Sequence, residues 1–373
     1  MELTILDNIF DKSLPAVSFS AGGCRAYCST LGILRGINEI INRVPYISGV
    51  SGSSWAIMIL SHLEDINIMF DINSEFKDFD NNLLVDLVVN MEPTYDLFSL
   101  LFKNSTDVGN QIANNNILKQ FNLNDKSLKR KDGWPTYIIG SCHWKNDKFL
   151  PIDITPEYTL IDNKAIMHDE KITITNVVTC SSYIISILPE FLSYEMNIKD
   201  NKVKVNDGAY IDILGIHSLL RRRCDRIFAT GIILLNTDGT LKFDCNITPE
   251  GINYNKIFEE WESIKEYLNN RLRERKICYY RTVVNVKDNI EYGIEAYQCE
   301  ILFYFVTKVD EFMQKIPVEI AISSELMQFP NYSLFLTNYH STVSLTKLQS
   351  YMIIALTEWC TKKIIEENID FFN

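Results

Sequence analysis

The sequence contains little glycine and proline, and it lacks the long apolar runs of membrane-spanning helices. Glycine and proline account for only 15 and 10 of the 373 residues, which argues against long disordered linkers. No stretch reaches the ~18 consecutive apolar residues of a transmembrane helix. The N-terminal MELTILDNIF has no basic segment followed by an apolar one, so we expect no signal peptide. These absences favour a globular protein of the cytoplasm.

The sequence also lacks an excess of positive charge and any pattern of metal-binding cysteines. The 36 basic and 48 acidic residues give a net charge of −12, which argues against a nucleic-acid-binding protein. The nine cysteines form no C-x-x-C pair and no Cys/His zinc pattern, so we expect reduced thiols, no metal and no other cofactor. Short basic runs such as Arg221-Arg222-Arg223 are expected on the solvated surface, or alternatively against an anionic lipid surface.

Short apolar runs alternate with helical patterns in the first part of the chain. Residues 16–20 and 45–49 are typical of buried strands, and residues 25–41 and 53–63 carry apolar residues at helical spacing. This alternation predicts an α/β fold with a mostly parallel central sheet. We expect a single domain over residues 1–373, with a helical insertion at about 65–131. Further strands are expected at 137–139, 149–152, 203–210, 226–235 and 300–306, a strand or a strand leading into a helix at 171–178, and helices at 211–220, 257–275 and 345–368.

The pattern Gly49-Val50-Ser51-Gly52-Ser53 matches the G-x-S-x-G signature of a nucleophilic serine. An apolar strand precedes it and a helical run follows it, which is the context that such an elbow needs. The flanking glycines remove side chains that would clash at the sharp turn, and the following helix directs its N-terminus at the serine. We interpret Ser51 as a nucleophile in acyl transfer. The alternative is a glycine-rich turn that packs a helix on a sheet.

A second glycine-rich loop, Ala21-Gly22-Gly23, lies between the first expected strand and helix. Paired glycines at this place expose backbone N–H groups, which suit an oxyanion or a phosphate. A nucleotide loop is the alternative interpretation. However, the loop has no G-x-x-x-x-G-K-[ST] motif, and Gly32 lies too far along the chain for a G-x-G-x-x-G fingerprint.

A serine nucleophile also needs a base, and the sequence offers two candidates. Among the five histidines only His340, in the polar segment TNYHST, has the late position that an α/β-hydrolase triad requires. Asp207 is the other candidate because it ends the expected strand KVKVND and precedes an apolar helical run. The carboxyl ends of parallel strands are where sites gather in α/β sheets. From the residues alone both candidates stay open.

These motifs together resemble the patatin and cytosolic phospholipase A2 superfamily. The segment from Gly49 to Trp55, GVSGSSW, is similar to the G-L-S-G-S-T-W elbow of the cytosolic phospholipase branch, and the glycine loop lies 28 residues before Ser51. Asp207-Gly208-Ala209 resembles the D-G-[GA] motif of the family's Ser-Asp dyad. Two further segments are similar to segments of this family and of its lysophospholipase branch, namely Cys180-Ser181-Ser182 through Leu188-Pro189-Glu190-Phe191, and Phe329-Pro330-Asn331-Tyr332-Ser333 with the helix from Leu345.

The resemblance implies a three-layer α/β/α catalytic domain and a role for each motif residue. Ser51 would be the nucleophile and Asp207 its general base, Gly22 and Gly23 would form the oxyanion hole, and Arg25 with Gly52 would contact the substrate. The sequence departs from the family at its first loop glycine, which is Ala21 here. Because only residues 1–20 precede the loop, we expect no calcium-binding C2 domain, and the large cap of the cytosolic enzymes is expected to be missing or reduced.

The expected function is therefore hydrolysis of fatty-acyl esters of phospholipids or lysophospholipids through an acyl-enzyme. The expected partners are that lipid and, transiently, a membrane surface, so the protein would be cytoplasmic with peripheral contact at membranes. The alternatives are a serine esterase that uses His340 and an inactive lipid-binding or interaction protein.

Overall fold

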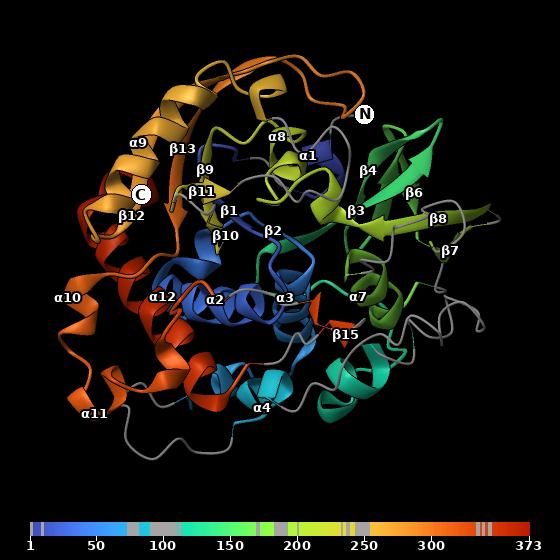
Figure 1. Cartoon of the computed structure of the whole chain (residues 1–373). Helices are drawn as coiled ribbons and strands as arrows, with labels where there is room; N and C mark the ends of the chain where they lie inside the picture. Colours follow the sequence, from blue (N-terminus) through green and yellow to red (C-terminus); the bar gives the residue numbers. More distant parts are fainter. Residues whose placement is uncertain are drawn as a thin grey trace.

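The computed structural model has a central sheet with helices on both faces (Figure 1). The strand order is β12-β13-β9-β1-β2-β3-β4-β5-β6, and β8 (Asn201–Asp207) with its partner β7 (Tyr194–Ile198) is attached to β3. This arrangement confirms the predicted three-layer α/β fold. The structure describes residues 3–8, 11–72, 82–89, 110, 113–168, 172–182, 193–199, 201–232, 234–235, 239–242, 254–332, 336–337, 340–341 and 345–373.

The middle of the sheet is parallel, as the alternation of strands and helices predicts. All neighbouring pairs run parallel across five strands, which are β13 (Tyr297–Phe305), β9 (Arg226–Gly231), β1 (Ala16–Phe19), β2 (Tyr46–Val50) and β3 (Thr136–Lys145). Antiparallel strands extend the two sides, namely β12 (Cys278–Val286) beside β13, and β4 (Lys148–Ile154), β5 (Tyr158–Ile161) and β6 (Lys164–Met167) beyond β3. The mostly parallel sheet is therefore confirmed at the centre, where the helices cross over.

The antiparallel strands beyond β3 follow from two tight turns that sequence analysis did not identify. Asn146 and Asp147 join β3 to β4, and both have positive φ, at 51° and 60°. Asp162 and Asn163 join β5 to β6 with φ of 50° and 59°. Two successive residues with positive φ are the requirement of the hairpin turn that matches strand twist, and Asn and Asp tolerate it best after glycine. The Asn-Asp and Asp-Asn pairs were therefore the missed signal.

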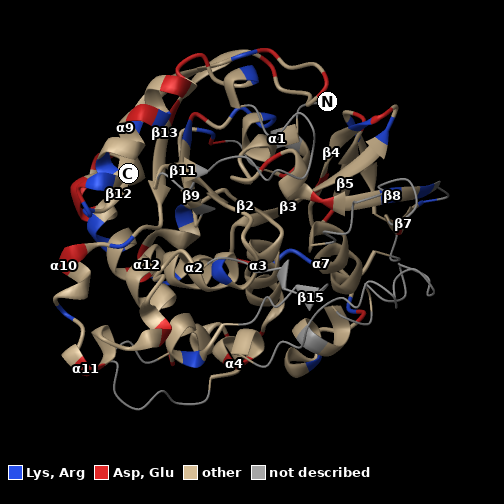
Figure 2. Ribbon diagram, in the orientation of Figure 1, with Lys and Arg blue, Asp and Glu red and all other residues tan. Residues whose placement is uncertain are grey.

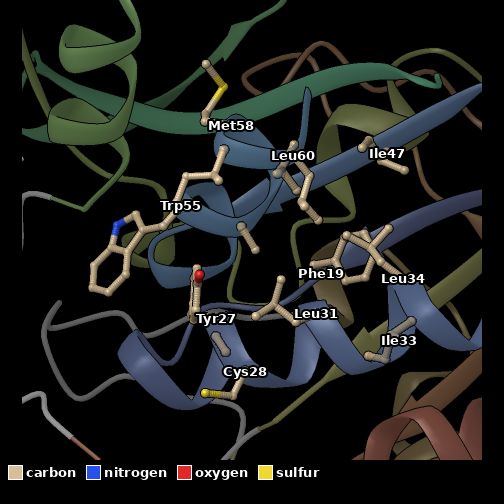
Figure 3. Packing of buried hydrophobic residues seen from close by; sticks show 14 of the residues in the cluster. Phe19, Tyr27, Cys28, Leu31, Ile33, Leu34, Ile47, Trp55, Met58 and Leu60 are labelled. Atoms are coloured by element: carbon tan, nitrogen blue, oxygen red, sulfur yellow. The ribbon is translucent and has the colours of Figure 1, made fainter. Parts of the chain in front are cut away.

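Alternate strand residues face the two helical layers. In β1 and β2, Phe19 and Ile47 belong to the core beneath α2 (Gly23–Gly36), α3 (Gly52–His62) and α12 (Lys347–Glu367), as Figure 3 shows for the first two helices. Ala16 and Tyr46 belong to the core beneath α8 (His217–Leu220) and α9 (Trp261–Arg273). Both faces of the sheet are thus buried, which explains why its strands are apolar throughout.

The distribution of charged residues agrees with the burial of the sheet. Figure 2 shows Lys, Arg, Asp and Glu along the outer helix α9, whereas β1 and β2 carry none. No described helix is both long and apolar enough to span a bilayer. The eight described cysteines are buried, and none of them forms a disulfide.

Several predictions about local structure need correction. Of the two alternatives for 171–178, a strand alone is wrong, because residues 174–182 form helix α7, and the Thr173 hydroxyl caps its start by accepting from the Asn176 N–H at 3.3 Å. Arg221 and Arg222 are buried, not solvated, because Asp153 lies 3.2 Å and 2.9 Å from their guanidinium groups. The helix expected at 211–220 begins only at residue 217.

The helical insertion expected at 65–131 lies partly outside the described residues, which omit 73–81, 90–109 and 111–112 in this range. Its described elements are η2 (Asn67–Met69), α4 (Leu83–Val89), η3 (Ala113–Leu118) and η4 (Lys119–Phe121). Beyond it, the structure describes α1 (Leu3–Leu6), η1 (Asn38–Arg43), β10 (Leu234–Leu235), β11 (Leu241–Lys242), η6 (Tyr254–Lys256), α10 (Asp310–Met313), α11 (Val318–Ala321), η7 (Ser324–Leu326), β14 (Leu336–Thr337) and α13 (Ile369–Phe372).

Helices α2 and α12 approach closely at glycines. A Cβ built on Gly32 would lie 2.0 Å from Thr357 Oγ1 and 2.3 Å from the Ile354 carbonyl oxygen. A Cβ on Gly36 would lie 2.6 Å from Thr361 Cβ. The close packing of α2 against α12 therefore requires glycine, which has no side chain, at positions 32 and 36.

We predict that Gly32→Ala destabilises the protein by about 1–3 kcal/mol through overpacking. In an exposed helix the same change would stabilise by about 1 kcal/mol, so the sign of the effect is diagnostic. Denaturant unfolding provides the measurement. Gly133→Ala puts no atom within 4 Å of the added Cβ but has a φ of 69°, so it is the comparison for backbone strain without a clash. A gain in stability for Gly32→Ala would contradict the close packing.

Candidate active site

Ser51 occupies a sharp turn between β2 and α3. Its φ of 55° and ψ of −131° lie outside the regions that residues with a side chain prefer. A strained backbone of this kind persists only where surrounding structure holds it, and it is common at functional sites. The predicted strand, elbow and helix are therefore present, and Ser51 lies at the carboxyl end of a parallel strand.

Hydrogen bonds from a neighbouring helix hold the elbow in this conformation. The Ser51 N–H donates to the carbonyl oxygen of Ser181 at 3.0 Å and lies 3.1 Å from its hydroxyl. That hydroxyl donates to the Gly140 carbonyl of β3 at 2.9 Å. On the other side, the Val50 N–H donates to the Ser53 hydroxyl at 2.9 Å. The C-terminal end of α7 thus anchors the nucleophile candidate to the sheet.

Asp207 reaches Ser51 because two strands meet end to end along one edge of β3. The first half of β3 pairs with β2, with Val50 opposite Gly140. The next residues pair with β8 (Asn201–Asp207), with Asp207 opposite Ser141. Because β4 occupies the other edge of β3, β2 and β8 share this edge and converge at their carboxyl ends.

This geometry corrects one step of the sequence argument. Asp207 ends a strand, as predicted, but β8 runs antiparallel to β3 instead of parallel to it. The convergence also requires two glycines, Gly208 of the Asp207-Gly208-Ala209 motif and Gly140, which sequence analysis did not single out. A Cβ on Gly208 would lie 2.7 Å from the Gly140 carbonyl oxygen, and one on Gly140 would lie 2.6 Å from Val50 Cγ1. A lone glycine within the apolar run TYIIGSC was the available signal for such a close approach.

The side chains of Ser51 and Asp207 are in direct contact. Ser51 Oγ donates to Asp207 Oδ2 at 2.7 Å, and the Ala209 N–H donates to Asp207 Oδ1 at 2.8 Å. Both residues are buried. Burial raises the pKa of Asp207 to about 7, although these two hydrogen bonds favour the charged form and lower it in part. The carboxyl group therefore changes its charge near neutral pH.

The glycine loop packs directly against the elbow. Gly22 and Gly23 have φ of 143° and 59°, a conformation that glycine adopts without strain. A Cβ on Gly52 would lie 2.0 Å from the Gly23 carbonyl oxygen, so Gly52 must be glycine for the two loops to touch. In the described part of the chain, the N–H groups of Gly22 and Gly23 donate to no other group. Since α2 begins at Gly23, these free donors lie at a helix N-terminus, where negative charge is favoured.

Arg25 follows in the first turn of α2 and is 2 % exposed. Its Nε and Nη1 have no hydrogen-bond partner among the described residues, and no described carboxylate raises its pKa. Burial without a counter-charge lowers its pKa to about 10, so the group stays protonated at neutral pH. A buried cation with free donors is expensive, and a bound anion would offset that cost.

The other candidates are placed as follows. His340 lies in the two-residue strand β15 (His340–Ser341), and its side chain is outside the described part of the structure. The segment Leu188-Pro189-Glu190-Phe191 and Ser333 are also outside it, whereas Cys180, Ser181 and Ser182 end helix α7. Within the described residues, no group of three or more His, Cys, Asp or Glu side chains is arranged to hold a metal ion.

Comparisons with known proteins give similarity of fold. No family model matches the sequence, and no curated protein matches it. A solved structure of human GIVD cytosolic phospholipase A2 has a TM-score of 0.58 with 10 % sequence identity over 99 % of this chain. A second structure of the human enzyme, in complex with methyl gamma-linolenyl fluorophosphonate inhibitor and terbium chloride, has a TM-score of 0.55 with 13 % identity over 99 % of this chain. The chain spans 64 % and 61 % of the two matched chains.

We predict that Asp207→Asn stabilises the protein at alkaline pH. The native pKa of Asp207 is raised, so its contribution to stability is present below the unfolded pKa of about 4 and is lost as pH rises through about 7. Asp207→Asn removes the titrating group, so the variant does not lose this stability as pH rises. Its melting temperature should therefore exceed that of the wild type above pH 7, on the order of 5 °C, and the difference should vanish toward pH 4.

The matched control is Asp288→Asn, which removes an exposed carboxylate. Melting curves of all three proteins between pH 4 and 8.5 provide the measurement. A difference between Asp207→Asn and wild type that does not change with pH would contradict the raised pKa.

Proposed function

We propose that the protein is a lipid acyl hydrolase in which Ser51 and Asp207 form the catalytic dyad. The hydrogen bond of 2.7 Å from Ser51 Oγ to Asp207 Oδ2, at a strained elbow, is the observation that carries this proposal. A nucleophile within hydrogen-bond reach of a base is the signature of an activated serine. The likeness of fold to human cytosolic phospholipase A2 supports the same conclusion.

The reaction has two steps, acylation and deacylation of Ser51, and Asp207 is the base in both. Ser51 Oγ attacks the ester carbonyl carbon while Asp207 takes the hydroxyl proton, and the carbonyl electrons move to the oxygen. When the tetrahedral intermediate collapses, the bond to the alcohol breaks and Asp207 returns the proton to the leaving oxygen. Water then attacks the acyl-enzyme, with Asp207 as base again, and releases the fatty acid and free Ser51.

The free N–H groups of Gly22 and Gly23 would stabilise the negative oxygen of both intermediates. One such donor contributes on the order of 3 kcal/mol of transition-state stabilisation. The pKa of about 7 for Asp207 suits its role, because a base that titrates near neutral pH is ionised enough to accept a proton and basic enough to hold it.

The substrate class follows from Arg25. A buried guanidinium with free donors would bind a phosphate, which a phospholipid or lysophospholipid carries and a simple ester does not. The inhibitor in the second neighbour contains a fatty chain and a fluorophosphonate group that resembles such a substrate. We therefore propose phospholipid or lysophospholipid esters as substrates, reached by transient contact of a cytoplasmic protein with a membrane surface.

We predict that Ser51→Ala and Asp207→Asn each lower lipid hydrolysis by more than about 10³-fold, because the two groups act as a unit. In the wild type, kcat should rise with pH through about 7 as Asp207 ionises. His340→Ala should keep its activity, whereas a loss equal to that of Ser51→Ala would favour the histidine triad. Fluorophosphonate labelling should be lost in Ser51→Ala. An unlabelled, folded wild type would instead indicate a binding protein without activity.

We also predict that Arg25→Met raises KM for a lysophospholipid by about 10–100-fold, as expected for loss of 1.5–3 kcal/mol of a hydrogen bond to a charged group. A neutral glyceryl ester with the same acyl chain lacks the phosphate, so its KM should change little. Arg25→Lys keeps the charge and should be intermediate for the lysophospholipid. An equal loss for both substrates would show that Arg25 has no selective contact with phosphate.

A further inference from the structure

The loop of residues 211–216, between Asp207 and α8, contacts each part of the candidate site. The Ala21 N–H, immediately before Gly22, donates to the Ile213 carbonyl oxygen at 2.8 Å. The Ser48 hydroxyl of β2 donates to the Gly215 carbonyl oxygen at 2.7 Å. The loop itself continues from the turn that Asp207 caps. It is therefore a direct link between the base, the elbow strand and the glycine loop.

The loop lies tightly against the end of β1. Gly215 has φ of 66°, and a Cβ added there would lie 2.6 Å from the Phe19 carbonyl oxygen. This positive φ also explains why residues 211–216 do not continue as the helix that their apolar pattern predicts. The position of the loop is thus constrained from the sheet side by a backbone contact.

On its other side the loop is held by the carboxylate of Asp212, which is 4 % exposed. Asp212 Oδ2 accepts from the His217 N–H at 2.7 Å, at the start of α8, and Oδ1 accepts from the Tyr254 hydroxyl at 3.0 Å. The Tyr254 oxygen in turn accepts from the Leu214 N–H at 3.0 Å. One carboxylate thus closes the loop through both of its oxygens.

Among the described residues, no Lys or Arg forms an ion pair with Asp212. Its one ion-pair contact there is His217 Nδ1, at 3.9 Å, and burial lowers the pKa of that imidazole and keeps it neutral at pH 7. Arg221 is near enough to interact electrostatically with Asp212, but the ion pairs of Arg221 and Arg222 are with Asp153. The direct contacts of the Asp212 carboxylate are therefore the hydrogen bonds that hold the loop.

We propose that Asp212 is a positioning residue, whose carboxylate holds the 211–216 loop and thereby places the glycine loop against Ser51 and Asp207. This proposal rests on the proposed function. Removal of the carboxylate would release the Ile213 carbonyl and with it Ala21, so the donors at Gly22 and Gly23 would shift from the reacting oxygen. Such donors act in the transition state, so kcat should fall while KM changes little.

The test compares Asp212→Ala, Asp212→Asn and Tyr254→Phe with the wild type. Asp212→Ala should lower kcat by about 100-fold, the effect of a misplacement of about 1 Å. Asp212→Asn should recover most of this loss, because the amide oxygen still accepts from the His217 N–H. Tyr254→Phe should lower kcat to a smaller extent, and it serves as the test if Asp212→Ala does not fold.

The matched control is Tyr158→Phe, which also removes a buried tyrosine hydroxyl, here one that accepts from Arg222 Nη2 at 2.7 Å. It should lower the melting temperature like Tyr254→Phe but leave kcat unchanged. Equal kcat for Asp212→Ala and wild type would overturn the proposal, as would losses of kcat that follow melting temperature in all variants.

Hydrogen–deuterium exchange separates this proposal from the proposed function. In Asp212→Ala, exchange should accelerate at Ala21, whose N–H donates to Ile213, and at the bonded amides of 211–217, but not in β13. Acceleration over the whole chain, or none at Ala21, would overturn the positioning role even in a protein without activity. If the wild type neither hydrolyses lipid nor labels, but Asp212→Ala shows the local change, only the proposed function is overturned.

Discussion

The candidate site depends on the head-to-head meeting of β2 and β8 along one edge of β3. The carboxyl ends of β2 and β8 lie at adjacent residues of β3, so Ser51 and Asp207 come together although 156 residues separate them. Two backbones approach this closely only without side chains between them, and Gly140 and Gly208 meet that requirement. The burial of both side chains and their hydrogen bond follow from this convergence, and hydrogen bonds from the end of α7 hold the strained elbow.

Burial then determines the chemistry of the two charged groups. Among the described residues no cation lies beside Asp207, and its pKa rises toward neutrality because two hydrogen bonds do not replace water fully. In the same part of the chain no carboxylate pairs with Arg25, and burial lowers its pKa, yet not far enough to lose the charge. Burial of a charge costs free energy at both residues. In contrast, Arg222 is fully paired, with Asp7 and Asp153, and its environment is purely structural.

Much of the fold could be predicted from the sequence because local patterns specify it. The strands at 16–19 and 46–50, the helices that follow them and the elbow between them have their own periodicity and turn residues. Prediction was incomplete where local patterns are ambiguous. The sequence left a strand and a strand leading into a helix open at 171–178, and residues 174–182 form a helix that Thr173 caps. The basic run at 221–223 is partly buried because Asp153 lies opposite, and this partner is far away along the chain.

The sequence by itself determined the identity of the nucleophile candidate, the glycine loop and the α/β architecture, because each depends on residues that are close along the chain. Only the tertiary structure showed that Ser51 is in contact with Asp207. From the residues Asp207 and His340 were both open, since a contact across 156 residues depends on strand pairing that no local pattern encodes. The contacts of Asp212 also depend on the tertiary structure, because its hydrogen bonds with the start of α8 and with Tyr254 exist only once the sheet is assembled.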